Sequence, residues 1–110
     1  MTTRKLEASE WQSYMDGITR QLPGIRAEIH VSGLDLGDQV ETERLRLDGI
    51  TYDARDGSLE IASESLHHVI SQPREIYVQE EAGALQSIEV VDADGHKQIV
   101  QLHRPLALPS

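Results

Sequence analysis

Apolar and polar residues alternate most regularly between residues 47 and 61, and this alternation predicts a β-hairpin. Ile50 and Tyr52 alternate with polar neighbours before a turn rich in Asp and Gly, and Leu59 and Ile61 do so after it. A four-residue loop over residues 54–57 would pair Tyr52 with Leu59 and Ile50 with Ile61, so that all four side chains share one face. Gly57 would supply the positive φ that closes such a loop.

Helical periodicity occurs in two other stretches. Residues 10–22 carry apolar side chains along one helical face and predict a long N-terminal helix: Trp11, Tyr14, Met15, Ile18 and Leu22. Ser9 and Gln12 have the spacing of a capping box at its start, and Pro23-Gly24 is expected to end it. Gly17 costs a helix about 1 kcal/mol relative to Ala, which indicates either tolerance or the close approach of another segment. Residues 63–72, with Leu66, Val69 and Ile70 at helical spacing, predict one or two turns of a second helix.

The remaining alternating segments predict strands over residues 27–31, about 39–47, 74–79, 85–91 and 97–104. Leu45 and Leu47 are expected to point inward, and Gly49 to mark a bulge where the apolar phase shifts. Residues 82–84 form a turn, and residues 93–95 close a second hairpin that pairs Ile88 with Val100 and Val90 with Gln98. The apolar tail, residues 105–110, is expected to lie extended against the body.

Together these elements predict an α+β fold in one domain, residues 1–110. It consists of a mainly antiparallel sheet of about six strands, one long N-terminal helix and one short helix in the middle of the chain. Tyr77, Val91 and Ile99 are out of phase with the other inward residues. They either lie under the long helix or form a patch that binds a partner.

Composition narrows the classes of function. The chain has 110 residues, no cysteine and a net charge of −9. The charge disfavours nucleic acid and anionic lipid as partners, and the absence of cysteine excludes disulfides and thiol nucleophiles. No apolar run is long enough to span a membrane, and the N-terminal residues lack the apolar core of a signal peptide. A cytoplasmic protein is expected, and residue usage (no Asn, more Arg than Lys) fits a bacterium with a GC-rich genome.

Candidate chemistry is sparse. On a helix, Glu64 and His68 would lie on one face and could share a metal ion, but a closed site needs about four ligands and no sequence neighbour supplies the others. The run that begins at Asp92 resembles the start of a calcium loop, yet His103 stands at the twelfth position, where such loops place Glu, so turn chemistry is predicted instead. No serine has the spacing of a nucleophile elbow, and the paired carboxylates lie in turns. No residue is assigned as catalytic, cofactor-binding or metal-binding.

Five stretches nevertheless resemble a small bacterial family, the domain of unknown function 5335. They are RKLEASEW from Arg4, GLDLGDQ from Gly33, GITYD from Gly49, PREIYV from Pro73 and EVVDADGHKQIV from Glu89. The resemblance covers nearly the whole chain and implies a single domain, but it brings no activity, ligand or catalytic residue.

The sequence therefore leaves two functional hypotheses. The first is a non-enzymatic cytoplasmic domain that binds a protein partner or self-associates, with no cofactor. The alternative is a small-molecule or metal-binding protein, conceivably a weak enzyme, that uses the polar candidates Tyr52, His67, His68 and Tyr77.

Overall fold

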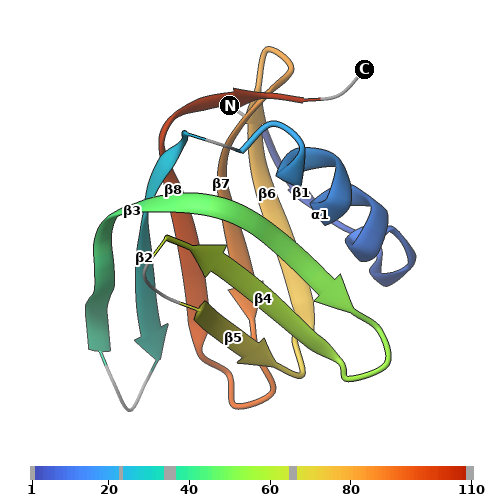
Figure 1. Ribbon diagram of the computed structural model, residues 1–110. Helices are drawn as coiled ribbons and strands as arrows, with labels where there is room; N and C mark the ends of the chain where they lie inside the picture. The colour runs from blue at the N-terminus through green and yellow to red at the C-terminus, as the bar shows by residue number, and fades with distance from the viewer. Residues whose placement is uncertain (1, 23, 34–36, 65–66, 109–110) are drawn as a thin grey trace.

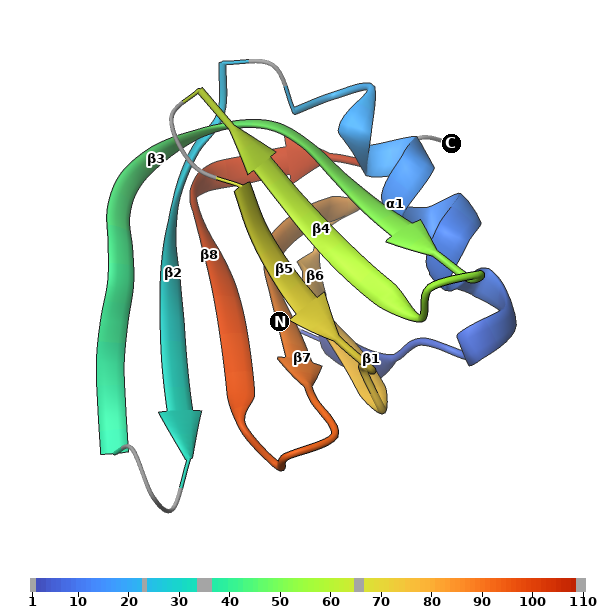
Figure 2. The same cartoon turned by 60° about the horizontal axis from the view of Figure 1, so that its bottom comes forward.

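In the computed structural model, which describes residues 2–22, 24–33, 37–64 and 67–108, the strands form one antiparallel sheet that folds over on itself (Figures 1 and 2). The eight strands are β1 (Thr2–Lys5), β2 (Arg26–Gly33), β3 (Gly37–Asp53), β4 (Ser58–Ser63), β5 (His67–Ser71), β6 (Glu75–Glu81), β7 (Ala84–Val91) and β8 (Lys97–Ala107). Their order across the sheet is β1-β6-β7-β8-β2-β3-β4-β5, so that β1 and β5 are the two edges.

The long strand β3 is what folds the sheet into two layers. It arches across the middle of Figure 1, and its second half, together with β4 and β5, crosses in front of β6, β7 and β8. Its pairing with β4 shifts register between Leu47 and Gly49, which confirms the predicted bulge. Because one bulge does not end a strand, the two strands expected on either side of Gly49 are a single strand. Leu47 is buried, whereas the side chain of Leu45 lies outside the part that the structure describes.

Both predicted hairpins are confirmed in register. Tyr52 pairs with Leu59 and Ile50 with Ile61, and Gly57 has a φ of +62°. In the second hairpin Ile88 pairs with Val100 and Val90 with Gln98. The turn at residues 82–84 is also present, with positive φ at Ala82 and Gly83.

The predicted long N-terminal helix is wrong. The α-helix, α1, runs over Trp11–Thr19 after a single 3-10 turn, Ala8–Glu10. The N–H of Glu7, not that of Ser9, donates to the side-chain carboxylate of the third residue along, Glu10, at 3.2 Å. After Thr19 the chain tightens into i→i−3 bonds, with Leu22 N–H donating to the Thr19 carbonyl at 3.2 Å. The apolar stripe continues into this turn and Leu22 is buried, so the pattern is longer than the helix.

The predicted short helix is also wrong, because the segment that contains His67 and His68 is the edge strand β5, paired with β4. Residues 65 and 66 lie outside the described part. A short apolar run fits the helical and the strand period equally well, and pairing with a neighbouring strand supplies hydrogen bonds that one turn of helix lacks. In the strand, His68 and Ile70 face inward and His67 and Val69 face outward.

The α+β class with about six strands is therefore wrong, since the described residues are mainly β. The sequence did not predict strand β1, because all four of its side chains are exposed and no apolar–polar alternation results. Backbone pairing with β6 keeps β1 in the sheet. The tail was expected to be extended, and β8 continues through Pro105 to Ala107, with Leu106 buried.

The core lies between the two layers and is closed on one side by α1, which packs on β3. It joins Trp11, Met15 and Ile18 of α1 to Ile29, Ile50, Leu59, Ile61, Ile76, Ile88 and Val100 of the sheet. Tyr77, Val91 and Ile99 are half-buried and alternate with buried neighbours, so they lie on the outer face of the sheet, not under α1. Whether they bind a partner stays a prediction. No helix in the described ranges is long and apolar enough to cross a membrane.

Candidate functional site

The four polar candidates from the sequence lie in four different places. Tyr52 packs edge-to-face on Trp11, with ring centroids 5.2 Å apart. His67 is exposed and bonds to Glu60 at 3.0 Å, while His68 turns inward and bonds to Gln98 at 2.6 Å. Tyr77 lies on the outer face of the other layer, 2.5 Å from the Glu75 carboxylate. The fold does not assemble them into one site.

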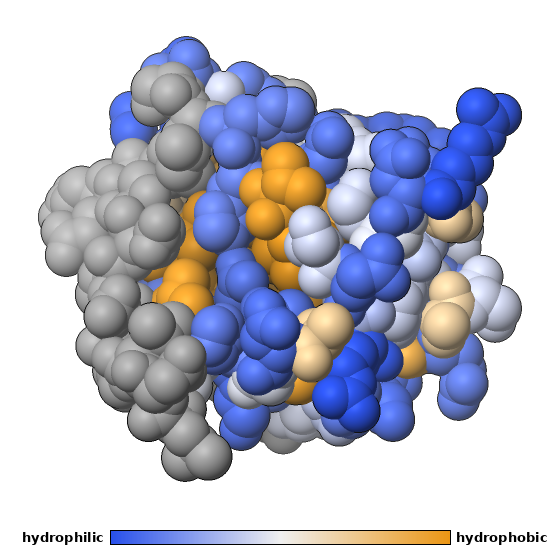
Figure 3. Space-filling view, turned by 90° about the horizontal axis from the view of Figure 1, so that it is seen from below, coloured by the Kyte–Doolittle hydropathy of each residue, from blue (hydrophilic) through white to orange (hydrophobic). Residues whose placement is uncertain are grey.

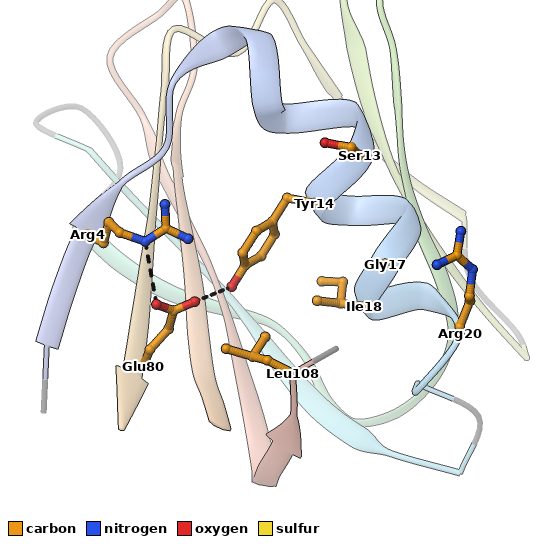
Figure 4. A pocket seen from close by; sticks show the side chains of 8 residues that line it. All are labelled: Arg4, Ser13, Tyr14, Gly17, Ile18, Arg20, Glu80 and Leu108. Atoms are coloured by element: carbon orange, nitrogen blue, oxygen red, sulfur yellow. Dashed lines mark hydrogen bonds and ion pairs between the residues drawn. The ribbon is translucent and has the colours of Figure 1, made fainter. Parts of the chain in front are cut away.

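A different cleft, which we call the α1 cleft, lies between α1, β1, β6 and the end of the chain (Figure 4). It has a volume of about 500 Å³. Its lining residues are Arg4, Ser13, Tyr14, Gly17, Ile18, Arg20, Glu80 and Leu108. The α1 cleft combines an apolar wall with charged groups, which is the usual composition of a ligand pocket.

One end of the α1 cleft is a closed polar cluster. The Tyr14 hydroxyl donates to Glu80 at 2.8 Å, and Arg4 donates to Glu80 at 3.5 Å and to Glu10 at 3.0 Å. The Arg4 guanidinium also lies 5.7 Å from the centre of the Tyr14 ring. Burial, followed by the bond to Glu80, raises the pKa of Tyr14, so the phenol stays protonated. The hydrogen bond from Arg4 lowers the pKa of the exposed Glu10 carboxyl.

The other end of the α1 cleft is open and basic. Figure 4 shows Arg20 at the end opposite Arg4 and Glu80, with Gly17 between them on the helix. Ser13, Gly17 and Arg20 recur at helical spacing, so they share a face of α1 next to Tyr14 and Ile18. Gly17, the glycine that stood out in the helical stripe of the sequence, therefore borders a cleft.

A second polar cluster holds the β7–β8 turn. Asp92 is buried, and its carboxylate accepts the N–H groups of Asp94 and His96 at 3.0 Å each and the Gln98 amide at 3.0 Å. These bonds are the turn chemistry that the sequence predicted. Ligand atoms of Asp92, Asp94 and His96 lie within 4.8 Å of one another, but hydrogen bonds already occupy both Asp92 oxygens. That no metal binds here stays a prediction.

Sequence reasoning missed Arg4, Glu80, Arg20, Thr19 and Gln98. Tyr14 and Glu80 are 66 residues apart and His68 and Gln98 are 30 apart, so no local spacing connects them. The one local signal was Gly17, a glycine within a helical stripe.

Comparison with known proteins places the chain in a family. Residues 2–110 match the family described as "Family of unknown function (DUF5335)". The chain belongs to the DUF5335 family. It is also 37% identical over 110 residues to an "Uncharacterized protein" from Aquifex aeolicus (strain VF5), an alignment that covers 99% of each chain. No solved structure matches this DUF5335 chain. Neither the family description nor the relative's title names an activity, a ligand or a partner.

Proposed function

We propose that this DUF5335 protein is a non-enzymatic cytoplasmic domain that associates with a second copy of itself through the free edge of β5. One observation carries the proposal. β5 is an outermost strand, and its Val69 is 48% exposed, which makes it the one large exposed hydrophobic side chain among the described residues. An exposed sheet edge is a template for another strand.

The two edge strands differ in whether their side chains oppose pairing with another sheet. β1 carries Arg4 and Lys5, and charged side chains on an edge strand oppose association with another sheet. β5 has the sequence HHVIS, without Lys, Arg or Pro. Figure 3, seen from the side where β5 and the β7–β8 turn lie, has hydrophobic surface near the middle of a largely hydrophilic face.

A second copy suits β5 because the strand is self-complementary. An antiparallel pair centred on Val69 places the two Val69 side chains together and His67 opposite Ser71 of the other copy. No acidic side chains of the two strands oppose each other. Each copy has a net charge of −9, so the long-range repulsion between copies should weaken as salt screens it. Association should therefore increase with ionic strength.

Three features support the non-enzymatic and cytoplasmic parts of the proposal. The polar candidates are dispersed, the Glu80 carboxylate of the α1 cleft is bonded to Arg4 and Tyr14, and a chain without cysteine gains no disulfide from an oxidising compartment. The negative net charge argues against nucleic acid or an anionic membrane as the partner.

The test is mass measurement by light scattering or sedimentation over a range of concentrations, at roughly 0.05 M and roughly 0.5 M salt. We expect a weak dimer that is stronger at high salt. Val69→Lys should give a monomer, whereas Thr51→Lys, with the same charge on the same outer face two strands away, should still dimerise. A monomer under all conditions, or a dimer unaffected by Val69→Lys, would refute the proposal.

A further inference from the structure

We propose that the α1 cleft binds a small organic anion, namely a carboxylate on a short apolar body. This second site does not involve β5, so it stands or falls independently of self-association. The wall of the cleft would contact the apolar body, and Arg20 would pair with the carboxylate.

The apolar part of the ligand follows from the wall. Ile18 is buried, and Tyr14 and Leu108 are half-buried against the core. The Tyr14 hydroxyl is directed to Glu80, which leaves the ring as the surface that faces the cleft (Figure 4). A volume of about 500 Å³ lies within the range of small-molecule pockets, roughly 300–1,000 Å³. The wall formed by Tyr14, Ile18 and Leu108 therefore fits a compact apolar group.

The charge of the ligand follows from the difference between the two arginines. Arg4 is neutralised by Glu10 and Glu80. Arg20 is exposed, and no carboxylate within the described ranges pairs with it. What distinguishes Arg20 is its place in the lining of the α1 cleft, where it is a positive group available to an anion in a chain with a net charge of −9. Its guanidinium matches the geometry of a carboxylate.

Gly17 connects the two parts of the site. It lies on α1 between Arg20 and the cluster around Glu80, and it belongs to the lining of the cleft. Glycine inside a helix is unfavourable relative to alanine. A residue that is unfavourable for the helix it lies in and that also lines a cleft is a candidate functional residue. We infer that Gly17 keeps the α1 cleft open.

The test uses three probes of one shape: 3-phenylpropionate, its neutral amide 3-phenylpropionamide, and the cation 3-phenylpropylamine. Each is titrated into the full chain, up to about 10 mM for weak ligands, while backbone amide resonances are followed by NMR. We expect the carboxylate to bind best and the amine worst, with shifts centred on Gly17 and Tyr14. No shift in α1 with any probe, shifts centred elsewhere, or equal binding of acid and amide would overturn the proposal.

Variants separate the two roles. Gly17→Leu should fill the cleft and weaken the binding of 3-phenylpropionate by about tenfold or more. Gln12 is exposed on α1 outside the lining of the α1 cleft, so the control Gln12→Leu should leave this binding unchanged. If Gly17→Leu does not fold, Gly17→Ala takes its place in the test. Gly17→Ala should raise the melting temperature and weaken the binding of 3-phenylpropionate. Arg20→Gln should weaken the binding of 3-phenylpropionate about three- to tenfold and leave the binding of the neutral amide unchanged. The control Arg74→Gln, on an exposed arginine remote from the lining, should change neither. Undiminished binding to the Gly17 variants or to Arg20→Gln would refute the site.

Discussion

At the scale of single residues, the hairpin between β3 and β4 shows how one strand can hold both a core position and a surface position. Leu59 is 1% exposed and faces Tyr52, whereas its neighbour Glu60 points outward and bonds to His67. In the turn, Gly57 has a φ of +62°, and a Cβ there would come within 3.0 Å of the Gln72 amide nitrogen. Because that atom ends a flexible side chain, the cost of a substitution lies mainly in the backbone.

These positions predict an order of stabilities. Leu59→Ala should lower the free energy of unfolding by about 2–5 kcal/mol through lost burial and a cavity. Gly57→Ala should lower it by about 1–2 kcal/mol through left-handed strain, and Glu60→Ala by no more than about 0.5 kcal/mol. Urea denaturation of the three variants measures the order. A large loss at Glu60 with little at Leu59 would mean that the strand presents its other face to the core.

The same hairpin shows what the sequence could predict at this scale. Its partners lie within a few residues of each other, so alternation and turn chemistry determine the register. The α1 cleft was not predictable, because Arg4, Tyr14 and Glu80 come from segments that only the folded sheet brings together. His67 and His68 were expected on a short helix, but on the strand β5 they face opposite sides, so the two imidazoles do not point toward a common ligand.

At the scale of elements, the end of α1 is fixed to β3 by one hydroxyl group. The Thr19 hydroxyl oxygen accepts the Ile50 N–H at 3.0 Å and lies 2.8 Å from the carbonyl oxygens of Ile50 and Met15. Ile50 follows the bulge at Gly49, where the ladder to β4 is disturbed. A Cβ at Gly49 would lie 3.1 Å from the Thr19 methyl group, so glycine permits this close approach. The bulge therefore provides the docking point of the helix.

We expect Thr19→Val to lower the free energy of unfolding by about 1–3 kcal/mol, because it leaves the polar backbone groups of Ile50 without the hydroxyl at similar side-chain volume. Thr19→Ser keeps the hydroxyl and should cost less than Thr19→Val. Denaturant titration compares the two variants, and hydrogen exchange at the Ile50 amide reports the bond directly. If Thr19→Ser lowers the free energy of unfolding as much as Thr19→Val does, the packing of the Thr19 methyl group fixes the helix to β3, and its hydroxyl does not.

The sequence predicted elements with one wet face and one dry face, such as β2, where Ala27, Ile29 and Val31 alternate with Glu28 and His30. It failed for the two edge strands. β1 has no buried face, so its sequence shows no alternation of apolar and polar residues. β5 is so short that its apolar residues fit the helical period and the strand period equally well. Both edges are defined by pairing with a neighbouring strand, which is information that a local pattern does not contain.

At the scale of the whole molecule, a chain of polar groups joins the two layers at the end away from α1. The Gln98 amide nitrogen donates to Asp92, so its oxygen accepts from His68, whose Nε2 therefore carries the proton. His68 belongs to the layer of β4 and β5, and Gln98 to that of β7 and β8. This connection joins the two layers in addition to the hydrophobic core between them.

A double-mutant cycle measures this connection. His68→Leu and Gln98→Leu should each destabilise the protein, and the double variant should lose less than the sum, with a coupling of about 0.5–3 kcal/mol. The matched control is the adjacent pair His67 and Glu60, whose bond is 3.0 Å long but is exposed and lies within one layer. Its coupling should be at most about 0.5 kcal/mol, because water screens it. Equal coupling in the two cycles would show that the bond between His68 and Gln98 holds the layers together no better than an exposed pair within one layer does.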